Sequence, residues 1–238
     1  MSGFSLLLSH QERLLQGAWL TFQLAVYSLI LALILGILAC IAQSSSKRFY
    51  SRLALGYTTI VRGVPDLVQL FLLYYGGQFI LNKITTALGY PMLEMTPFIT
   101  GILTIGFMFG AYMAESFRGG LQAIPKGQLE AARAFGMNER AIFWRITRPQ
   151  MLRYALPSIG NNWLVLMKST SLVSIIGLKD LVFVANVSAR AAQRKDLWAG
   201  FWFYGAVAVF FLLMTTISLG LLSLLQKKYS AHLSQPIH

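Results

Sequence analysis

Cysteine and acidic side chains are both scarce in this sequence. The only cysteine, Cys40, lies inside an apolar run, so an intramolecular disulfide is excluded and a catalytic thiol has no support. Asp and Glu number 8 against 20 Lys and Arg, and charged residues make up 12% of the chain, whereas 56% is hydrophobic. Soluble globular proteins carry about twice that share of charge. The composition therefore places the chain in a lipid bilayer.

Sequence signatures of enzymes and of nucleic-acid binding are also missing. There is no GxxxxGK(S/T) loop to hold nucleotide phosphates, no HExxH pair and no GxSxG elbow. The histidines, which lie near the chain ends without metal-ligand spacing, are His10, His232 and His238. The net charge of +12 comes from basic residues separated by long apolar runs. We therefore expect no catalysis, no bound metal and no nucleic-acid partner. If the protein works with ATP, another subunit must supply the ATPase.

Five apolar segments reach the roughly 20 residues that span a bilayer. We expect transmembrane helices at about residues 17–42, 53–81, 98–117, 154–176 and 199–225. The first lacks the features of a cleaved signal peptide and is expected to remain in the protein. The second is interrupted by Arg62, Pro65 and Asp66, so its span is expected to begin near Pro65. With residues 178–198 interpreted as a mixed loop, the chain is predicted to be an all-α integral membrane protein with one transmembrane domain, residues 1–238.

The distribution of Lys and Arg predicts how these helices are oriented. One side of the membrane holds Lys47, Arg48, Arg52, Arg118, Lys126, Arg133, Arg140, Arg145, Arg148, Arg153, Lys227 and Lys228. The other side holds the smaller set Arg13, Lys83, Lys179, Arg190, Arg194 and Lys195. The positive-inside rule therefore places the N-terminus outside and the C-terminus in the cytoplasm. Residues 122–153, which we call the central loop, are then cytoplasmic.

The central loop is the one long segment dense in charge, and local signals divide it into two short helices. Pro125 suits a first helical position, and Gly136 suits a left-handed end to the first helix. Asn138 is a good N-cap for the second helix, which is expected to stop before Pro149. Apolar residues recur at helical spacing, namely Leu129, Ala132, Phe135, Ile142, Phe143 and Ile146. Each helix therefore has an apolar side that could pack against a partner, which an ordinary solvated loop would not need.

The central loop also carries a family resemblance. The residues that stand at the spacing of the EAA cytoplasmic loop of bacterial ABC importers are Glu130, Ala131, Ala132, Gly136, Ile146 and Pro149. Arg148 departs from that pattern, which usually has an apolar residue there. Further stretches similar to polar amino-acid permeases are residues 62–68, 110–118 and 161–177. Over roughly residues 16–226 the chain most resembles the Q-type permease subunits for histidine or for lysine, arginine and ornithine.

This resemblance implies a type I ABC importer fold, in which the EAA loop couples the permease to its ATPase. It implies a bacterial inner-membrane subunit that translocates polar, and specifically basic, amino acids. The expected partners are a second permease subunit forming a heterodimer, two ATPase subunits that bind ATP and Mg, and a periplasmic solute-binding protein. No cofactor is expected on this chain. Alternatives are import of glutamine or opines by the same mechanism, or an ion-coupled carrier or channel, which would not require the amphipathic central loop.

Polar residues inside the fourth predicted span are candidates for the substrate path, because ionisable groups in a bilayer are costly. Lys168 could face a polar cavity and receive a substrate carboxylate. Asn161 lies on nearly the same helical face, and Ser171 follows Lys168 by about one turn. The competing interpretation is a structural lysine that reaches a helix end or the membrane interface.

Three further charged residues lie in or near the predicted spans. Asp66 could meet a cationic group of the substrate, although an ion pair with Arg62 at i and i+4 is an equally good interpretation. Glu115 and Arg118 are spaced as an i, i+3 pair near the cytoplasmic end of the third helix. We interpret them as a structural pair or a gate.

Overall fold

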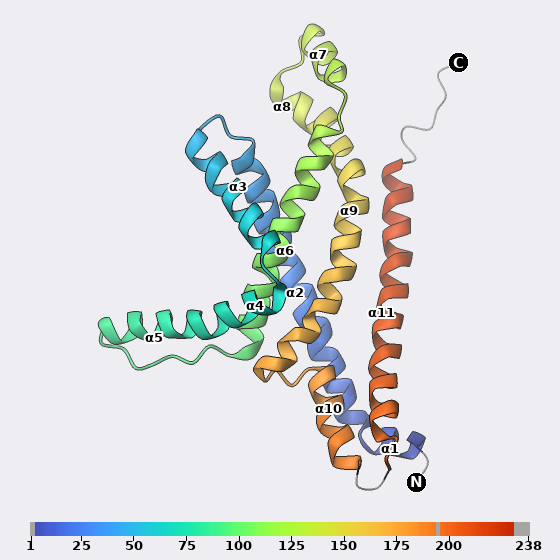
Figure 1. Cartoon of the computed structure of the whole chain (residues 1–238). Coiled ribbons are helices and arrows are strands. Elements are labelled where there is room, and N and C mark those ends of the chain that lie inside the picture. The colour runs from blue at the N-terminus through green and yellow to red at the C-terminus, as the bar shows by residue number, and fades with distance from the viewer. Residues whose placement is uncertain (1–2, 194–195, 231–238) are drawn as a thin grey trace.

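The structure is a computed structural model that describes residues 3–193 and 196–230, and this part of the chain is helical with connecting turns. Arg194, Lys195, His232 and His238 lie outside the described residues. In chain order the helices are α1 (Gly3–Ser9), α2 (Gln11–Gln43), α3 (Arg48–Gly63), α4 (Asp66–Phe71), η1 (Leu72–Gly76), α5 (Gly77–Ala87), α6 (Pro97–Gln122), α7 (Lys126–Ala134), α8 (Glu139–Ile142), η2 (Phe143–Thr147), α9 (Arg148–Ser169), η3 (Thr170–Ile176), α10 (Leu181–Ala192) and α11 (Ala199–Ser230). Figure 1 shows α2, α6, α9 and α11 running along the length of the molecule.

The described helices provide up to five membrane spans. Three helices are long and apolar enough to cross a bilayer by themselves, namely α2, α6 and α11. Two bent pairs provide the others, one formed by α3 with α4 to α5 and one formed by α8 to η3 with α10. The predicted first, third and fifth helices thus lie within α2, α6 and α11, each of which continues beyond the predicted bounds.

The interruption predicted near Pro65 is confirmed, but residues 53–81 are not one helix, because the chain bends by 112° between α3 and α4. Val64 precedes Pro65 and is extended, at φ −102° and ψ 135°, as the proline ring demands of the residue before it. Gln69 Nε2 then donates to the carbonyl oxygens of Val61 and Val64, at 2.8 and 2.7 Å, which satisfies acceptors at the open end of α3. Pro65 therefore creates a corner, from which α5 projects sideways (Figure 1).

The mixed loop predicted at residues 178–198 is also wrong, because most of it is the helix α10. Asp180 caps this helix, with its Oδ1 accepting from the backbone N–H of Phe183 at 2.9 Å. Gly177, at φ +93°, makes the sharp turn that ends η3 just before the cap. The backbone N–H of Leu181 donates to Thr21 Oγ1 at 3.1 Å, which fixes the start of α10 against α2.

The helix expected to stop before Pro149 instead continues into α9. Segments α8, η2 and α9 follow one another without a break, and Pro149 lies in the first turn of α9. Proline has no backbone N–H to donate within a helix, and its ring needs room next to the preceding turn. The wider π-helical turn of η2, which comes directly before the first turn of α9, provides that room. The fourth predicted helix, residues 154–176, is therefore the later part of a longer helical segment that ends in the 3₁₀ turn η3.

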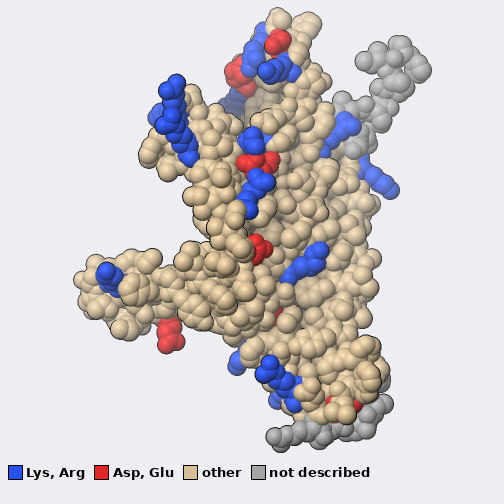
Figure 2. Space-filling model, viewed as in Figure 1, with Lys and Arg blue, Asp and Glu red and all other residues tan. Residues whose placement is uncertain are grey.

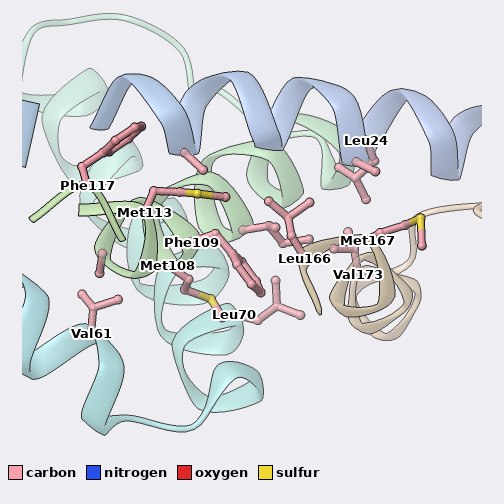
Figure 3. Packing of buried hydrophobic residues seen from close by; sticks show 14 of the residues in the cluster. Leu24, Val61, Leu70, Met108, Phe109, Met113, Phe117, Leu166, Met167 and Val173 are labelled. Atoms are coloured by element: carbon pink, nitrogen blue, oxygen red, sulfur yellow. The ribbon is translucent and has the colours of Figure 1, made fainter. Parts of the chain in front are cut away.

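Helix α6 occupies the middle of the core. Its Met108, Phe109 and Met113 are at most 2% exposed and belong to one buried cluster with Leu24 of α2 and Leu166 of α9. Figure 3 shows Leu24 nearer to Met167 and Val173 than to these residues of α6. Glycine permits the close approach to α2, because a Cβ at position 106 would lie 2.6 Å from Leu31 Cδ2. In a bilayer the hydrophobic effect does not drive helices together, so their association depends on the close van der Waals packing that small residues at this crossing permit.

Candidate functional site: the central loop and the intramembrane charges

The central loop forms a two-helix projection at one end of the molecule, built from α7, α8 and η2 (Figure 1). Pro125 is the N-cap of α7 and not its first residue, at φ −61° and ψ 125°. Asn138 caps α8, with its Oδ1 accepting from the backbone N–H of Ala141 at 2.8 Å. Arg133 Nε donates to Glu139 Oε1 at 2.7 Å, and this hydrogen bond lowers the pKa of the Glu139 carboxyl. The pair joins the two helices across the turn.

Gly136 makes the turn between α7 and α8, as predicted, with φ +76°. Its backbone N–H donates to the carbonyl of Arg133 at 2.9 Å, and that of Met137 donates to the carbonyl of Ala132 at 3.1 Å. These two bonds form a Schellman motif, whose left-handed residue is glycine because a Cβ is unfavourable there. The angle between the two helices is therefore set by one backbone conformation.

The apolar side chains of the central loop separate into a buried and an open set. Ala132 of α7 and Ile142 of α8 are 5% and 2% exposed, and the two helices are in contact. Phe135 is 88% exposed and Trp144 is 53% exposed. Of the other predicted loop residues, Ile146 is half-buried while Glu130, Ala131, Gly136 and Pro149 are exposed. The loop thus has a small core of its own and presents polar and apolar groups outward.

Glu115 is the centre of a charged cluster that joins three helices, which we call the Glu115 cluster. Arg118 Nε donates to Glu115 Oε2 at 3.1 Å, which shows the predicted i, i+3 ion pair. Arg62 of α3 approaches the same oxygen at 3.7 Å, and Gln43 of α2 donates to Oε1 at 3.3 Å. The predicted alternative, in which Arg62 pairs with Asp66, is wrong because the corner at Pro65 turns α4 away and Arg62 contacts Glu115.

Lys168 lies in the last turn of α9 and its side chain is exposed on the isolated chain. Asn161, on the same helix, is also exposed, whereas Ser171 is half-buried and donates to the carbonyl of Lys168 at 2.8 Å. Among the described residues the ammonium of Lys168 has no ion pair. A cation at a helix C-terminus is also favoured by the helix dipole, so its position alone fits both interpretations.

Asp66 lies in the first turn of α4 and is half-buried. Within the described residues its side chain forms no ion pair, and no side-chain hydrogen bond joins it to Lys168, Asn161 or Ser171. The structure therefore brings the Glu115 cluster together but does not join the four proposed substrate-path residues into one site on a single chain.

Sequence reasoning missed a second polar cluster between α6 and α9. Ser116 and Ser158 lie 2.7 Å apart through their hydroxyls, and Asn162 Nδ2 donates to Ser116 Oγ at 2.9 Å. Asn162 thus faces α6 and is distinct from the exposed Asn161. The sequence did contain a signal for this cluster. Asn161 and Asn162 are adjacent on one helix, so their side chains must point in directions about 100° apart and cannot share one environment.

Known permease proteins of amino-acid transport systems are similar to this chain over most of its length. The permease protein HisQ of the histidine/lysine/arginine/ornithine transport system of Escherichia coli K12 is 45% identical over 217 residues, which cover 91% of this chain and 93% of HisQ. The arginine ABC transporter permease protein ArtQ of the same organism is 33% identical, covering 86% of this chain and 90% of ArtQ.

The fold of this chain also matches that of a solved transporter structure. A crystal structure of an amino acid ABC transporter with histidines matches with a TM-score of 0.79 and 28% identity, covering 96% of this chain and 99% of that one. Residues 28–231 match the family described as binding-protein-dependent transport system inner membrane component. This chain therefore belongs to the family of inner membrane components of binding-protein-dependent transport systems.

Proposed function

We propose that this chain is a membrane subunit of an ABC importer that carries basic amino acids across the bacterial inner membrane. The observation that carries this proposal is the 45% identity to the HisQ permease over 91% of the chain. The substrates are proposed to be histidine, lysine, arginine and ornithine. The octopine transport system permease OccQ is less similar than HisQ, at 35% identity. ATP hydrolysis belongs to a separate ATPase subunit.

The central loop is proposed to dock on that ATPase. Its exposed Glu130 offers a polar contact, and its exposed Phe135 offers an apolar one next to the fixed turn at Gly136. A rigid projection with an unpartnered aromatic ring suits insertion into a groove on a partner, because a buried aromatic side chain contributes strongly to binding. ATP and Mg would be bound by the ATPase and not by this chain.

The assembly is proposed to contain two ATPase copies, a second permease subunit forming a heterodimer, and a periplasmic solute-binding protein. The substrate path would then run between two permease subunits. Lys168 and Asn161 are exposed on this chain, which fits a surface completed by a partner subunit and substrate. Lys168 would receive the substrate carboxylate, with Ser171 beyond it, and Asp66 or a partner residue would balance a cationic side chain.

Uptake by the reconstituted importer tests the proposal. The complete complex, co-expressed with its ATPase and binding protein, is placed in proteoliposomes and supplied with radiolabelled amino acids. We expect ATP-dependent uptake of arginine, lysine, ornithine or histidine, and no comparable uptake of glutamine or octopine. Uptake driven by a proton or sodium gradient without ATP would identify an ion-coupled carrier instead. Mass spectrometry of the purified complex would test the heterodimer and the two ATPase copies.

A further inference from the structure

An apolar groove runs along the outside of the helix bundle between α2, α9 and α11. Its main part is a cavity of about 480 Å³, lined by side chains that include Phe22, Leu33, Ile159, Trp163, Ile217 and Leu221. A smaller cavity between α2 and α11 extends it toward the start of α2 and shares Phe22 and Met214 with it. The groove therefore follows much of the length of α11, from Phe210 to Leu225.

The polar atoms at the floor of this groove already have partners. Trp163 Nε1 donates to Ser218 Oγ at 2.9 Å, so the two polar side chains in the lining satisfy each other. A polar solute such as an amino acid would lose its hydration here without gaining hydrogen bonds. The lining instead suits an apolar occupant, and lipid acyl chains are the apolar molecules that surround such a helix.

The chemistry changes at the end of the groove that lies on the predicted cytoplasmic side. A cavity of about 270 Å³ there shares Leu156 with the groove and is otherwise lined by Arg153, Tyr154, Pro157, Gln226 and Tyr229. Arg153 is half-buried and, among the described residues, has neither an ion pair nor a side-chain hydrogen bond. Lys227 and Lys228 lie in the last turn of α11, between Gln226 and Tyr229, which line this cavity, and Figure 2 shows basic side chains around this end of α11.

We propose that an anionic phospholipid of the inner leaflet occupies this site, with an acyl chain in the groove and its phosphate at Arg153. Guanidinium and phosphate form strong charge-assisted hydrogen bonds, and Tyr154 and Tyr229 add hydroxyl donors. Among the described residues no carboxylate lines the cavity, so a zwitterionic lipid would place its ammonium beside the Arg153 guanidinium. Charge complementarity thus selects a net negative headgroup, as basic pockets between transmembrane helices do elsewhere. The inference does not depend on which substrate is transported.

Native mass spectrometry tests the headgroup contact. The complete complex is purified from membranes containing equal amounts of phosphatidylglycerol and phosphatidylethanolamine, and retained lipids are counted. Wild type should retain phosphatidylglycerol preferentially. Arg153→Gln should reduce that preference roughly tenfold, the factor that one charge-assisted hydrogen bond supplies. Arg52→Gln is the matched control, because Arg52 is an exposed arginine at the same predicted side of the membrane, on α3. Equal lipid retention by the two variants would overturn the proposal.

A second pair of variants tests the acyl-chain groove. Ile217 and Leu219 are both exposed on α11 at 63% and 51%, but only Ile217 lines the groove. Ile217→Trp should displace retained lipid by filling the groove, whereas Leu219→Trp should leave it in place, and both are apolar changes that a bilayer tolerates. Photocrosslinking from position 217 should label lipid. Crosslinks to a second permease subunit would show instead that this face is a protein interface, which would overturn the proposal.

Discussion

Lys168 carries the sharpest test at the scale of single residues. Its exposed ammonium has no ion pair within the described chain, and a cation at that depth requires water, a partner or a substrate to compensate its desolvation. If Lys168 receives the substrate carboxylate, Lys168→Met should lower uptake at least roughly tenfold, because one charge-assisted hydrogen bond is lost. The measurement is uptake and substrate-stimulated ATP hydrolysis in proteoliposomes.

The control for this prediction is Lys179→Met, because Lys179 is an exposed lysine in the turn before α10 and has no proposed role. It should transport like wild type. If Lys168→Met also transports at the wild-type rate in an assembled complex, Lys168 is a structural lysine that interacts with the end of its helix.

We expect Glu115 to stabilise the folded helix bundle. Its carboxylate is 18% exposed at the side chain and accepts from Arg118 and Gln43 while facing Arg62, so Glu115→Gln leaves two guanidinium groups without their counter-charge. We expect a loss of about 1–3 kcal/mol, the usual cost of breaking a partly buried charged hydrogen bond. Thermal unfolding of the complex in nanodiscs measures it. Glu94→Gln is the control, because Glu94 is exposed and, in the described chain, unpaired. Equal unfolding temperatures would show that the cluster does not stabilise the bundle.

At the scale of elements, the turn between α7 and α8 decides how the central loop is presented. Gly136→Val places a branched side chain at φ +76°, which costs about 1–2 kcal/mol and favours a different turn. We expect reduced co-purification of the ATPase and reduced substrate-stimulated hydrolysis. Gly127→Val is the matched control, because Gly127 lies within α7 and its added Cβ meets no atom within 4 Å. Wild-type coupling in Gly136→Val would remove the main support for docking through this loop.

Sequence patterns predicted some elements better than others for physical reasons. Long apolar runs identified α2, α6 and α11, and the strong local preferences of Gly136 and Asn138 identified the turn and cap of the central loop. The patterns failed at α10 because its charged neighbours resembled a loop, while the cap at Asp180 is completed by a contact with Thr21 far away in sequence.

The candidate site shows the same division between local and distant contacts. The Glu115–Arg118 pair follows from helical spacing, which sequence reveals. The contact of Arg62 with Glu115 depends on how α3 packs against α6 after the corner at Pro65, and no local pattern reports that packing. Substrate-path residues are harder still, because their partners would lie on another subunit.

At the scale of the whole molecule, the two ends of the bundle differ in a way that predicts its orientation. The central loop lies at the same end as the C-terminal end of α11, and α1 and α10 lie at the opposite end (Figure 1). At that opposite end Leu6 of α1 packs in a small cluster with Ala185, Ala189 and Phe203. The charge-rich loop and the C-terminal lysines therefore share one side of the membrane, which the positive-inside rule makes cytoplasmic.

Reporter fusions test this orientation directly. A reporter that is active only in the cytoplasm should be active when fused after Lys228 and inactive when fused after Leu197, because α11 separates the two positions by one crossing. Leu197 is 88% exposed and lies in the turn before α11, so the fusion does not need to break a packed contact. A fusion after Gly89, in the turn that follows α5, should report the same side as Leu197. Activity after Leu197, or its absence after Lys228, would reverse the assigned orientation and separate the central loop from the compartment that supplies ATP.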